Sequence, residues 1–211
     1  MSRKPSERPA RLRQLRLDEA RREADSCRRC DLWRSATQTV FGEGAVDADV
    51  MLVGEQPGDQ EDKAGKPFVG PAGRVLEDAL QAAGLATTKR YVTNAVKHFK
   101  WEPRGKRRIH LKPNPAQLLA CQYWLEQEIE FVKPKLVVAL GATAVRALLG
   151  TTARVLRDRG KAFTSRFGDV IVTVHPSSIL RAPDADARKA AMAAFVLDLK
   201  AAAKYLRRQQ R

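Results

Sequence analysis

Residues Val50–Gly73 read VMLVGEQPGDQEDKAGKPFVGPAG, and this stretch decides how the rest of the chain is interpreted. It begins with Val50–Gly54, an apolar segment typical of a buried strand. A long acidic loop with several glycines follows, and glycines let a backbone approach a flat ligand closely. Loops at the carboxyl ends of parallel strands are where α/β proteins bind their ligands. The stretch therefore predicts a parallel strand that ends in a ligand-binding loop.

The same pattern recurs along the chain, with short apolar segments separated by longer helix-like ones. Further strands are expected at Tyr91–Asn94, Leu136–Gly141 and Val170–Val174, and helices at Gly73–Ala83, Pro115–Val132, Ala142–Leu149 and Ala185–Leu206. This alternation predicts an α/β fold of three layers, in which helices flank a mainly parallel central sheet. The 211 residues, 44% of them hydrophobic, suit a single domain over residues 1–211.

Basic residues dominate the composition, because 39 Lys and Arg against 24 Asp and Glu give a formal net charge of +15. The segment 1–26 is rich in arginine, and Arg3–Arg29 is expected to form an exposed basic helix. Phosphate binding by Lys and Arg releases counterions, which favours a nucleic acid over a membrane as the partner. A merely solvated charged surface is the simpler alternative. No apolar run of about 18 residues and no apolar signal segment occur, so we expect a cytoplasmic monomer, associated with the nucleoid when bound to DNA.

The chain has three cysteines: Cys27 and Cys30 form a Cys-x-x-Cys pair, and Cys121 lies in an expected helix. An odd number argues against a disulfide framework, and such a pair is typical of metal or redox sites. His98 is available as a fourth ligand, since mixed Cys/His sets occur in iron–sulfur sites. Three Cys and one His would also suit zinc. A free buried Cys121 and a solvated His98 are the alternative without a metal.

Four motifs follow one another in the chain: Gly54-Glu55-Gln56-Pro57-Gly58, Gly65-Lys66-Pro67-Phe68-Val69-Gly70, Thr93-Asn94-Ala95-Val96-Lys97 and His175-Pro176-Ser177-Ser178. In order and spacing they resemble the motifs of the uracil-DNA glycosylase superfamily, especially its family-four iron–sulfur branch. The match extends from about Cys27 to Leu206, and four ordered motifs are far more specific than one glycine pattern. The resemblance implies the fold of that superfamily, with uracil-containing DNA, single-stranded or duplex, as the partner.

Two departures from the family-four pattern resemble another branch, UdgX, whose members become covalently attached to DNA where a uracil has been excised. Gln56 stands where family four usually has Ala, and His98 stands where it has a fourth Cys. The sharpest marker is a basic insertion, Lys106-Arg107-Arg108-Ile109-His110, within the long stretch Lys97–Pro113 that we interpret as a functional loop. The resemblance implies a structural 4Fe–4S cluster held by Cys27, Cys30, His98 and Cys121.

An enzyme that acts on a base must first turn that nucleotide out of the stack and hold the base in a pocket. Phe68 is expected to stack on the uracil, and the amide of Asn94 to read its edge. Ser177 and Ser178 are expected to bind the flanking phosphates. Without the resemblance, Phe68 would more often be a core residue and Asn94 a turn former.

Cleavage of the glycosidic bond leaves positive charge on the sugar and negative charge on the departing uracil. His175 is expected to donate a hydrogen bond to uracil O2, helped by backbone N–H groups around Gln56 and Asp59. Glu55 is expected to favour the cationic sugar, or to orient the group that attacks it.

The attacking group decides between turnover and self-trapping. A water oriented by Glu55 would leave an abasic site, whereas attack by His110 would join the protein to the DNA. Arg107 and Arg108 are expected to hold the loop against phosphates and keep His110 near the sugar. We therefore expect a self-trapping uracil-DNA glycosylase, with a conventional multi-turnover glycosylase and a non-catalytic uracil-DNA binding module as alternatives.

Overall fold

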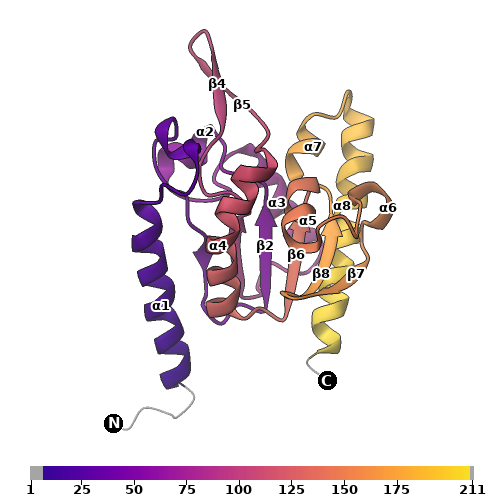
Figure 1. Ribbon diagram of the computed structural model, residues 1–211. Coiled ribbons are helices and arrows are strands. Elements are labelled where there is room, and N and C mark those ends of the chain that lie inside the picture. The colour runs from indigo at the N-terminus through magenta and orange to yellow at the C-terminus, as the bar shows by residue number, and fades with distance from the viewer. Residues whose placement is uncertain (1–6, 210–211) are drawn as a thin grey trace.

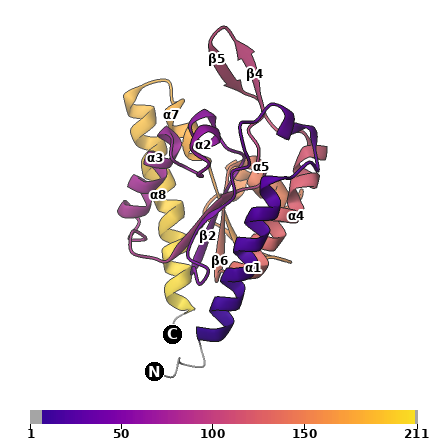
Figure 2. The same ribbon diagram turned by 90° about the vertical axis from the view of Figure 1, so that its left-hand side faces the viewer.

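The computed structural model describes residues 7–209, which form a six-stranded sheet between two layers of helices (Figures 1 and 2). The strands lie in the order β1-β3-β2-β6-β8-β7. Their bounds are Glu43–Gly44 for β1, Val50–Gly54 for β2, Arg90–Asn94 for β3, Leu136–Leu140 for β6, Ala162–Ser165 for β7 and Gly168–Thr173 for β8. The four middle strands are parallel, and β1 and β7 pair antiparallel at the two edges. The predicted α/β fold with a mainly parallel central sheet is confirmed.

Each face of the sheet is covered by its own set of helices (Figure 2). One face packs against α1 (Glu7–Asp25), α4 (Pro115–Val132) and α5 (Ala142–Leu149), and the other against α3 (Pro71–Ala82) and α8 (Ala185–Arg208). Short helices occupy the connections: η1 (Asp31–Arg34), α2 (Asp59–Ala64), α6 (Val155–Asp158) and α7 (Pro176–Leu180). No described helix has the length and apolar character needed to cross a bilayer.

Local sequence explains why the long helices begin where they do. Asn114 caps α4 by accepting a hydrogen bond from the Gln117 backbone N–H at 2.8 Å, and Pro115 occupies the first turn. Asp184 caps α8 in the same way through the Ala187 N–H at 2.7 Å. The expected bounds of α4 agree with the structure, and α8 extends from the expected Leu206 to Arg208.

The amino-terminal helix differs from its expectation. Within the described part of the chain, which excludes residues 1–6 of the expected range Arg3–Arg29, the helix covers Glu7–Asp25 and so ends before Arg29. The helix is also not simply exposed, because Leu17, Ala20 and Ala24 are buried in the core it shares with α4. One face of this arginine-rich helix carries apolar residues at helical spacing, and that face packs in the core.

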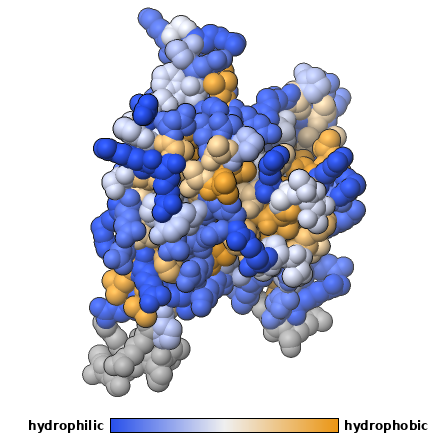
Figure 3. All heavy atoms as spheres, viewed as in Figure 1, coloured by the Kyte–Doolittle hydropathy of each residue, from blue (hydrophilic) through white to orange (hydrophobic). Residues whose placement is uncertain are grey.

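The expected functional loop Lys97–Pro113 contains a β-hairpin of strands β4 (Trp101–Arg104) and β5 (Arg107–His110). The hairpin projects beyond the carboxyl ends of the parallel strands (Figure 1). The turn passes through Gly105, whose φ of 59° lies in the left-handed region that favours glycine. Most of the hairpin is exposed. The face drawn in Figure 3 is largely hydrophilic, with apolar side chains gathered mainly over its middle and right-hand part.

Candidate active site

A cavity of about 940 Å³ opens at the carboxyl ends of the parallel strands. All the predicted substrate-contacting residues except Arg107 and Arg108 line it: Glu55, Gln56, Asp59, Phe68, Asn94, His110, His175, Ser177 and Ser178. They come from the loop after β2, the end of β3, the end of β5 and the segment after β8. The topology therefore brings together residues that are more than 100 positions apart in the chain.

The residues expected to bind the base meet above Gly54, the last residue of β2. A methyl group on Gly54 would lie 2.3 Å from the Asn94 amide oxygen and 2.7 Å from the Phe68 ring, so only glycine permits this approach. Phe68 has a φ of 56°, which is costly for an aromatic residue and is typical of functional sites. The ring centroid of Phe68 lies 5.9 Å from that of His175. A flat ring, a buried amide and an imidazole thus surround one space.

The hydrogen bonds of His175 define its protonation. The Ser177 backbone N–H donates to Nδ1 at 3.2 Å, which leaves the proton of the neutral ring on Nε2. Burial lowers the pKa of His175 to about 4. His175 is therefore neutral near pH 7 and can donate through Nε2–H.

The two serine hydroxyls of the fourth motif are engaged within the protein. Ser177 Oγ lies 2.8 Å from His175 Nδ1, and Ser178 Oγ donates to the His175 carbonyl oxygen at 2.8 Å. Arg181 also donates to Ser177 Oγ at 3.0 Å. In this arrangement the hydroxyls hold the His175 segment, and their contact with phosphates stays a prediction.

A carboxylate and an imidazole face each other on the hairpin side of the cavity. His110 Nε2 lies 3.3 Å from Glu55 Oε1, although the His110 side chain is still 47% exposed. The other oxygen, Oε2, accepts a short hydrogen bond from the Thr143 hydroxyl. Burial alone would raise the pKa of Glu55, but the hydrogen bonds from His110 and Thr143 outweigh it and hold the pKa below its ordinary value. Glu55 is therefore a carboxylate near pH 7, and a neutral His110 that donates Nε2–H to it keeps a lone pair on its other nitrogen.

The side chain of Gln56 ties the base of the hairpin to the loop after β2. Its amide N–H₂ donates to the carbonyl oxygens of Lys100 at 3.1 Å and Leu111 at 3.0 Å, and its oxygen accepts from the Lys100 N–H at 3.2 Å. Both legs of the hairpin are therefore held by one side chain.

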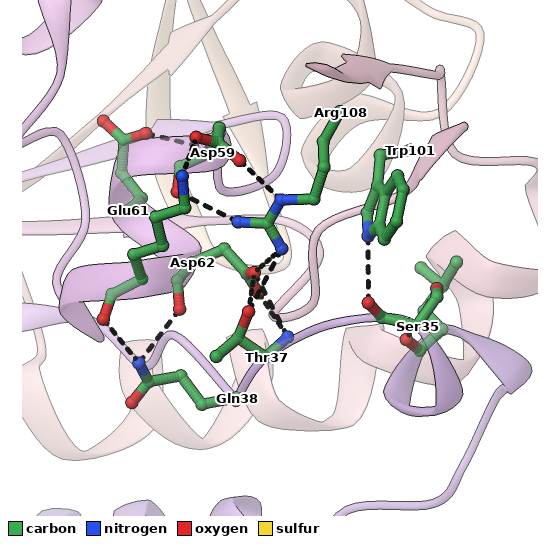
Figure 4. Close-up of polar contacts among 11 residues, drawn as sticks. Ser35, Thr37, Gln38, Asp59, Glu61, Asp62, Trp101 and Arg108 are labelled. Carbon is green, nitrogen blue, oxygen red and sulfur yellow. Dashed lines mark hydrogen bonds and ion pairs between the residues drawn. The ribbon is translucent and has the colours of Figure 1, made fainter. Parts of the chain in front are cut away.

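Arg108 holds the hairpin against α2 rather than pointing to solvent (Figure 4). Its guanidinium donates to Asp59 Oδ1 at 2.5 Å, to Asp62 Oδ2 at 2.6 Å and to the Thr37 hydroxyl at 3.1 Å. Asp62 of α2 is fully buried. Arg107, which precedes Arg108 on β5, is exposed. The expected contact of Arg108 with phosphate is replaced here by an internal one, and Asp59 contributes its side chain to this cluster.

The predicted cluster ligands lie between the end of α1, the segment after β3 and α4. Interaction with the Cys121 thiol lowers the pKa of Cys30 to about 7. Cys27 accepts a hydrogen bond from the Trp124 indole at 3.1 Å, and Cys121 accepts one from a backbone N–H at 3.4 Å. His98 is buried, and its Nδ1 has no hydrogen-bond partner. Such N–H···S contacts and a free imidazole nitrogen suit the donor set of a cluster.

The side chains of the described residues do not converge into a group of three or more His, Cys, Asp or Glu with metal-binding geometry. The fit to a cluster therefore rests on residue type, on burial and on the unpartnered nitrogen of His98. Zinc with the same four residues stays an alternative.

Two residues with evident roles at the site escaped sequence reasoning. Asp62 lies in the acidic loop but only its burial beneath Arg108 reveals its function. Thr143 begins α5 and contacts Glu55, which is 88 residues away in the chain. The one signal available for Thr143 was its position just after the parallel strand β6, where side chains reach the ligand edge of the sheet.

Comparison with known proteins agrees with this geometry. The family model described as the uracil DNA glycosylase superfamily matches residues 41–200. The type-4 uracil-DNA glycosylase of Pyrobaculum aerophilum is 38% identical over 166 residues, which cover 75% of this chain and 81% of the relative. The type-4 uracil-DNA glycosylase of Thermotoga maritima is 38% identical over 157 residues, which cover 74% and 78%. A type-5 uracil-DNA glycosylase of Pyrobaculum aerophilum is 30% identical over 170 residues, covering 72% and 71%. The chain belongs to the uracil-DNA glycosylase superfamily.

Proposed function

We propose that this protein excises uracil from DNA and then becomes covalently joined to the abasic sugar through His110. Family membership and the type-4 relatives support uracil-DNA glycosylase activity. The self-trapping step is supported by one observation above all: His110 lies in the cavity, 3.3 Å from the Glu55 carboxylate. An imidazole so oriented is a competent nucleophile.

Recognition of the base uses the cluster above Gly54. An extruded uracil would stack on Phe68 and present its edge to the Asn94 amide, which offers one donor group and one acceptor. His175 Nε2–H would donate to uracil O2 as negative charge develops there. A cytosine presents the reverse hydrogen-bonding pattern and would leave buried polar groups unpaired.

The proposed reaction exchanges one bond at the sugar for another. The bond between sugar C1′ and uracil N1 breaks, and its electron pair leaves with the uracil. The lone pair of the His110 imidazole forms a new C–N bond at C1′, and the positive charge moves onto the ring. Glu55, whose carboxylate contacts Nε2, stabilises that charge and accepts the Nε2 proton, which leaves a neutral substituted imidazole.

The proposal is tested with purified protein and an oligonucleotide that carries one uracil, in single-stranded and duplex form. Free uracil and an SDS-resistant protein–DNA band are measured in the same reaction. A band that forms with one uracil released per protein supports self-trapping. Free abasic product with many turnovers would support a conventional glycosylase instead, and binding without uracil release would support a non-catalytic module.

The four residues Cys27, Cys30, His98 and Cys121 would hold a 4Fe–4S cluster. Such a cluster would supply a structural crosslink between the end of α1, the segment after β3 and α4, and no step of the reaction depends on it. We expect the purified protein to be brown and to contain iron and acid-labile sulfide. Cys121→Ser is expected to lose the colour together with stability. Colourless protein with stoichiometric zinc would contradict the assignment.

Asn94→Ala is expected to lower the preference for uracil over cytosine by about 10- to 100-fold, because a buried hydrogen bond left unmade costs about 1–3 kcal/mol. The amide is 2% exposed, so water does not replace it readily. Single-turnover release of the two bases from matched oligonucleotides measures the effect. Asn114→Ala, which removes a helix cap outside the cavity, serves as the control. An unchanged preference in the Asn94 variant would remove the amide from base recognition.

Uracil release is expected to persist to mildly acidic pH and to fall as the pH drops through about 4. The pKa of His175 is lowered, so its neutral, donating form survives below the range of an ordinary imidazole and is lost only near pH 4. The pKa of Glu55 is also lowered, so the carboxylate persists over the same range. The profile is measured as single-turnover uracil release by the wild-type protein, because His110 helps to hold the pKa of Glu55 low. A fall centred between pH 6 and 7 would contradict the assignment.

A further inference from the structure

Thr143 makes a contact with Glu55 that none of the roles above explains. It is the second residue of α5, and it is buried with 4% exposure. Its hydroxyl donates to Glu55 Oε2, the carboxylate oxygen that does not face His110. Among the described residues, two side chains make polar contact with the Glu55 carboxylate: Thr143 hydrogen-bonds to Oε2, and His110 Nε2 lies 3.3 Å from Oε1.

The support behind Thr143 is rigid. Its neighbours Ala144 and Val145 are packed in the core, and the N–H of Gly141 donates to the Thr173 carbonyl at 2.9 Å. A threonine is restricted about χ1 because it branches at Cβ, and the hydrogen bond to Glu55 selects the rotamer that places the hydroxyl. A hydrogen bond to one oxygen of a carboxylate fixes the direction of the other oxygen. The start of α5 therefore determines where Glu55 Oε1 points.

We propose that Thr143 is a positioning residue: by occupying Oε2 it directs Oε1 of Glu55 at His110 and so favours attack by the imidazole over attack by water. The inference rests on the proposed function and deepens it. A water molecule that attacks the sugar needs an acceptor for its proton, and Thr143 withholds one of the two carboxylate oxygens from that task. The remaining oxygen is in contact with His110.

Removing the hydroxyl has two separate consequences. Glu55 becomes free to rotate, which misaligns His110, and misplacement of a reacting group by about 1 Å can cost about 100-fold in rate. The hydrogen bond from Thr143 also helps to lower the pKa of Glu55, so its loss raises that pKa. The carboxylate would then be protonated at a higher pH, and the loss of activity on the acid side of the pH profile would begin at a higher pH.

The test compares wild type, Thr143→Val and Thr143→Ser on a single-stranded oligonucleotide with one uracil. Valine keeps the branched shape without the hydroxyl, and serine keeps the hydroxyl without the methyl group. Uracil release and the covalent band are measured in the same single-turnover reaction across a pH range that extends below about 4, so that the acid limb of the wild type is included. We expect the covalent fraction of released uracil to fall about tenfold in Thr143→Val, with an acid limb at higher pH. Thr143→Ser is expected to stay within about twofold of wild type in both measurements, because it keeps the hydrogen bond.

A Thr143→Val variant with the wild-type covalent fraction and an unshifted acid limb would overturn the inference. Thr143→Ala replaces the valine variant if that variant does not fold, which thermal unfolding reports. Failure of the proposed function has a different signature. If wild type releases uracil without any band, self-trapping is wrong, and the acid limb of uracil release in the valine variant still decides whether Thr143 positions Glu55.

Discussion

Replacing His110 with serine or glycine is expected to abolish the SDS-resistant protein–DNA band while uracil release continues. The imidazole is the proposed nucleophile, and its removal leaves Glu55 facing a space that water can enter, since His110 is 47% exposed. We expect the covalent yield to fall by at least about 100-fold, the scale on which a positioned reactive side chain acts. Repeated uracil release by one protein molecule would then show that turnover has been gained. A denaturing gel and a count of uracil released per protein measure both effects.

The control for this variant is Lys106→Ala, which removes an exposed side chain from the turn of the same hairpin. It is expected to keep the band, because Lys106 does not line the cavity. A band that persists in His110→Ser, with the DNA attached to another residue, would remove His110 from its assigned role. Loss of both the band and uracil release would instead show that the ring is needed for excision itself.

The sequence predicted the central layers of this fold well because their signals are local. Val50–Gly54 is apolar at every position, and all five residues of β2 are buried. Pro115, which suits the first turn of a helix, marks the start of α4. The edge strands β1 and β7 were missed because they are short and partly exposed, so they carry no apolar run. Their pairing depends on neighbours distant in the chain.

The site was predictable to the extent that strand ends determine it. Glu55 and His175 follow parallel strands and Asn94 ends one, and the topology brings such positions together at one edge. The contacts that orient these residues were not predictable, because an arginine or a threonine can reach many partners. Arg108 could have faced phosphates, and only the packing of the hairpin on α2 shows that it binds two carboxylates.

Arg108→Ala is expected to slow covalent trapping by about 100-fold or more, with a smaller loss of uracil release. The guanidinium joins β5 to α2 through Asp59 and Asp62, and Asp62 is fully buried. Removing one partner of a buried ion pair costs about 3–5 kcal/mol, although the 18% exposure of Arg108 reduces this figure. Without this contact the docked position of the hairpin is destabilised, so the hairpin detaches from α2 and moves His110 away from Glu55. Trapping at saturating DNA, together with hydrogen exchange of the hairpin amides, measures the change.

Arg107→Ala distinguishes this docking role from phosphate binding, because it removes the same charge from the same strand at an exposed position. If Arg108 acted on phosphate, both variants would weaken DNA binding, lower the salt dependence by about one counterion and leave trapping at saturating DNA unchanged. If Arg108 docks the hairpin, its loss slows trapping even when all the protein is bound to DNA, whereas the Arg107 variant stays within about twofold of wild type. Equal trapping rates for the two variants at saturation would therefore show that the contact between Arg108 and the carboxylates of α2 does not position His110.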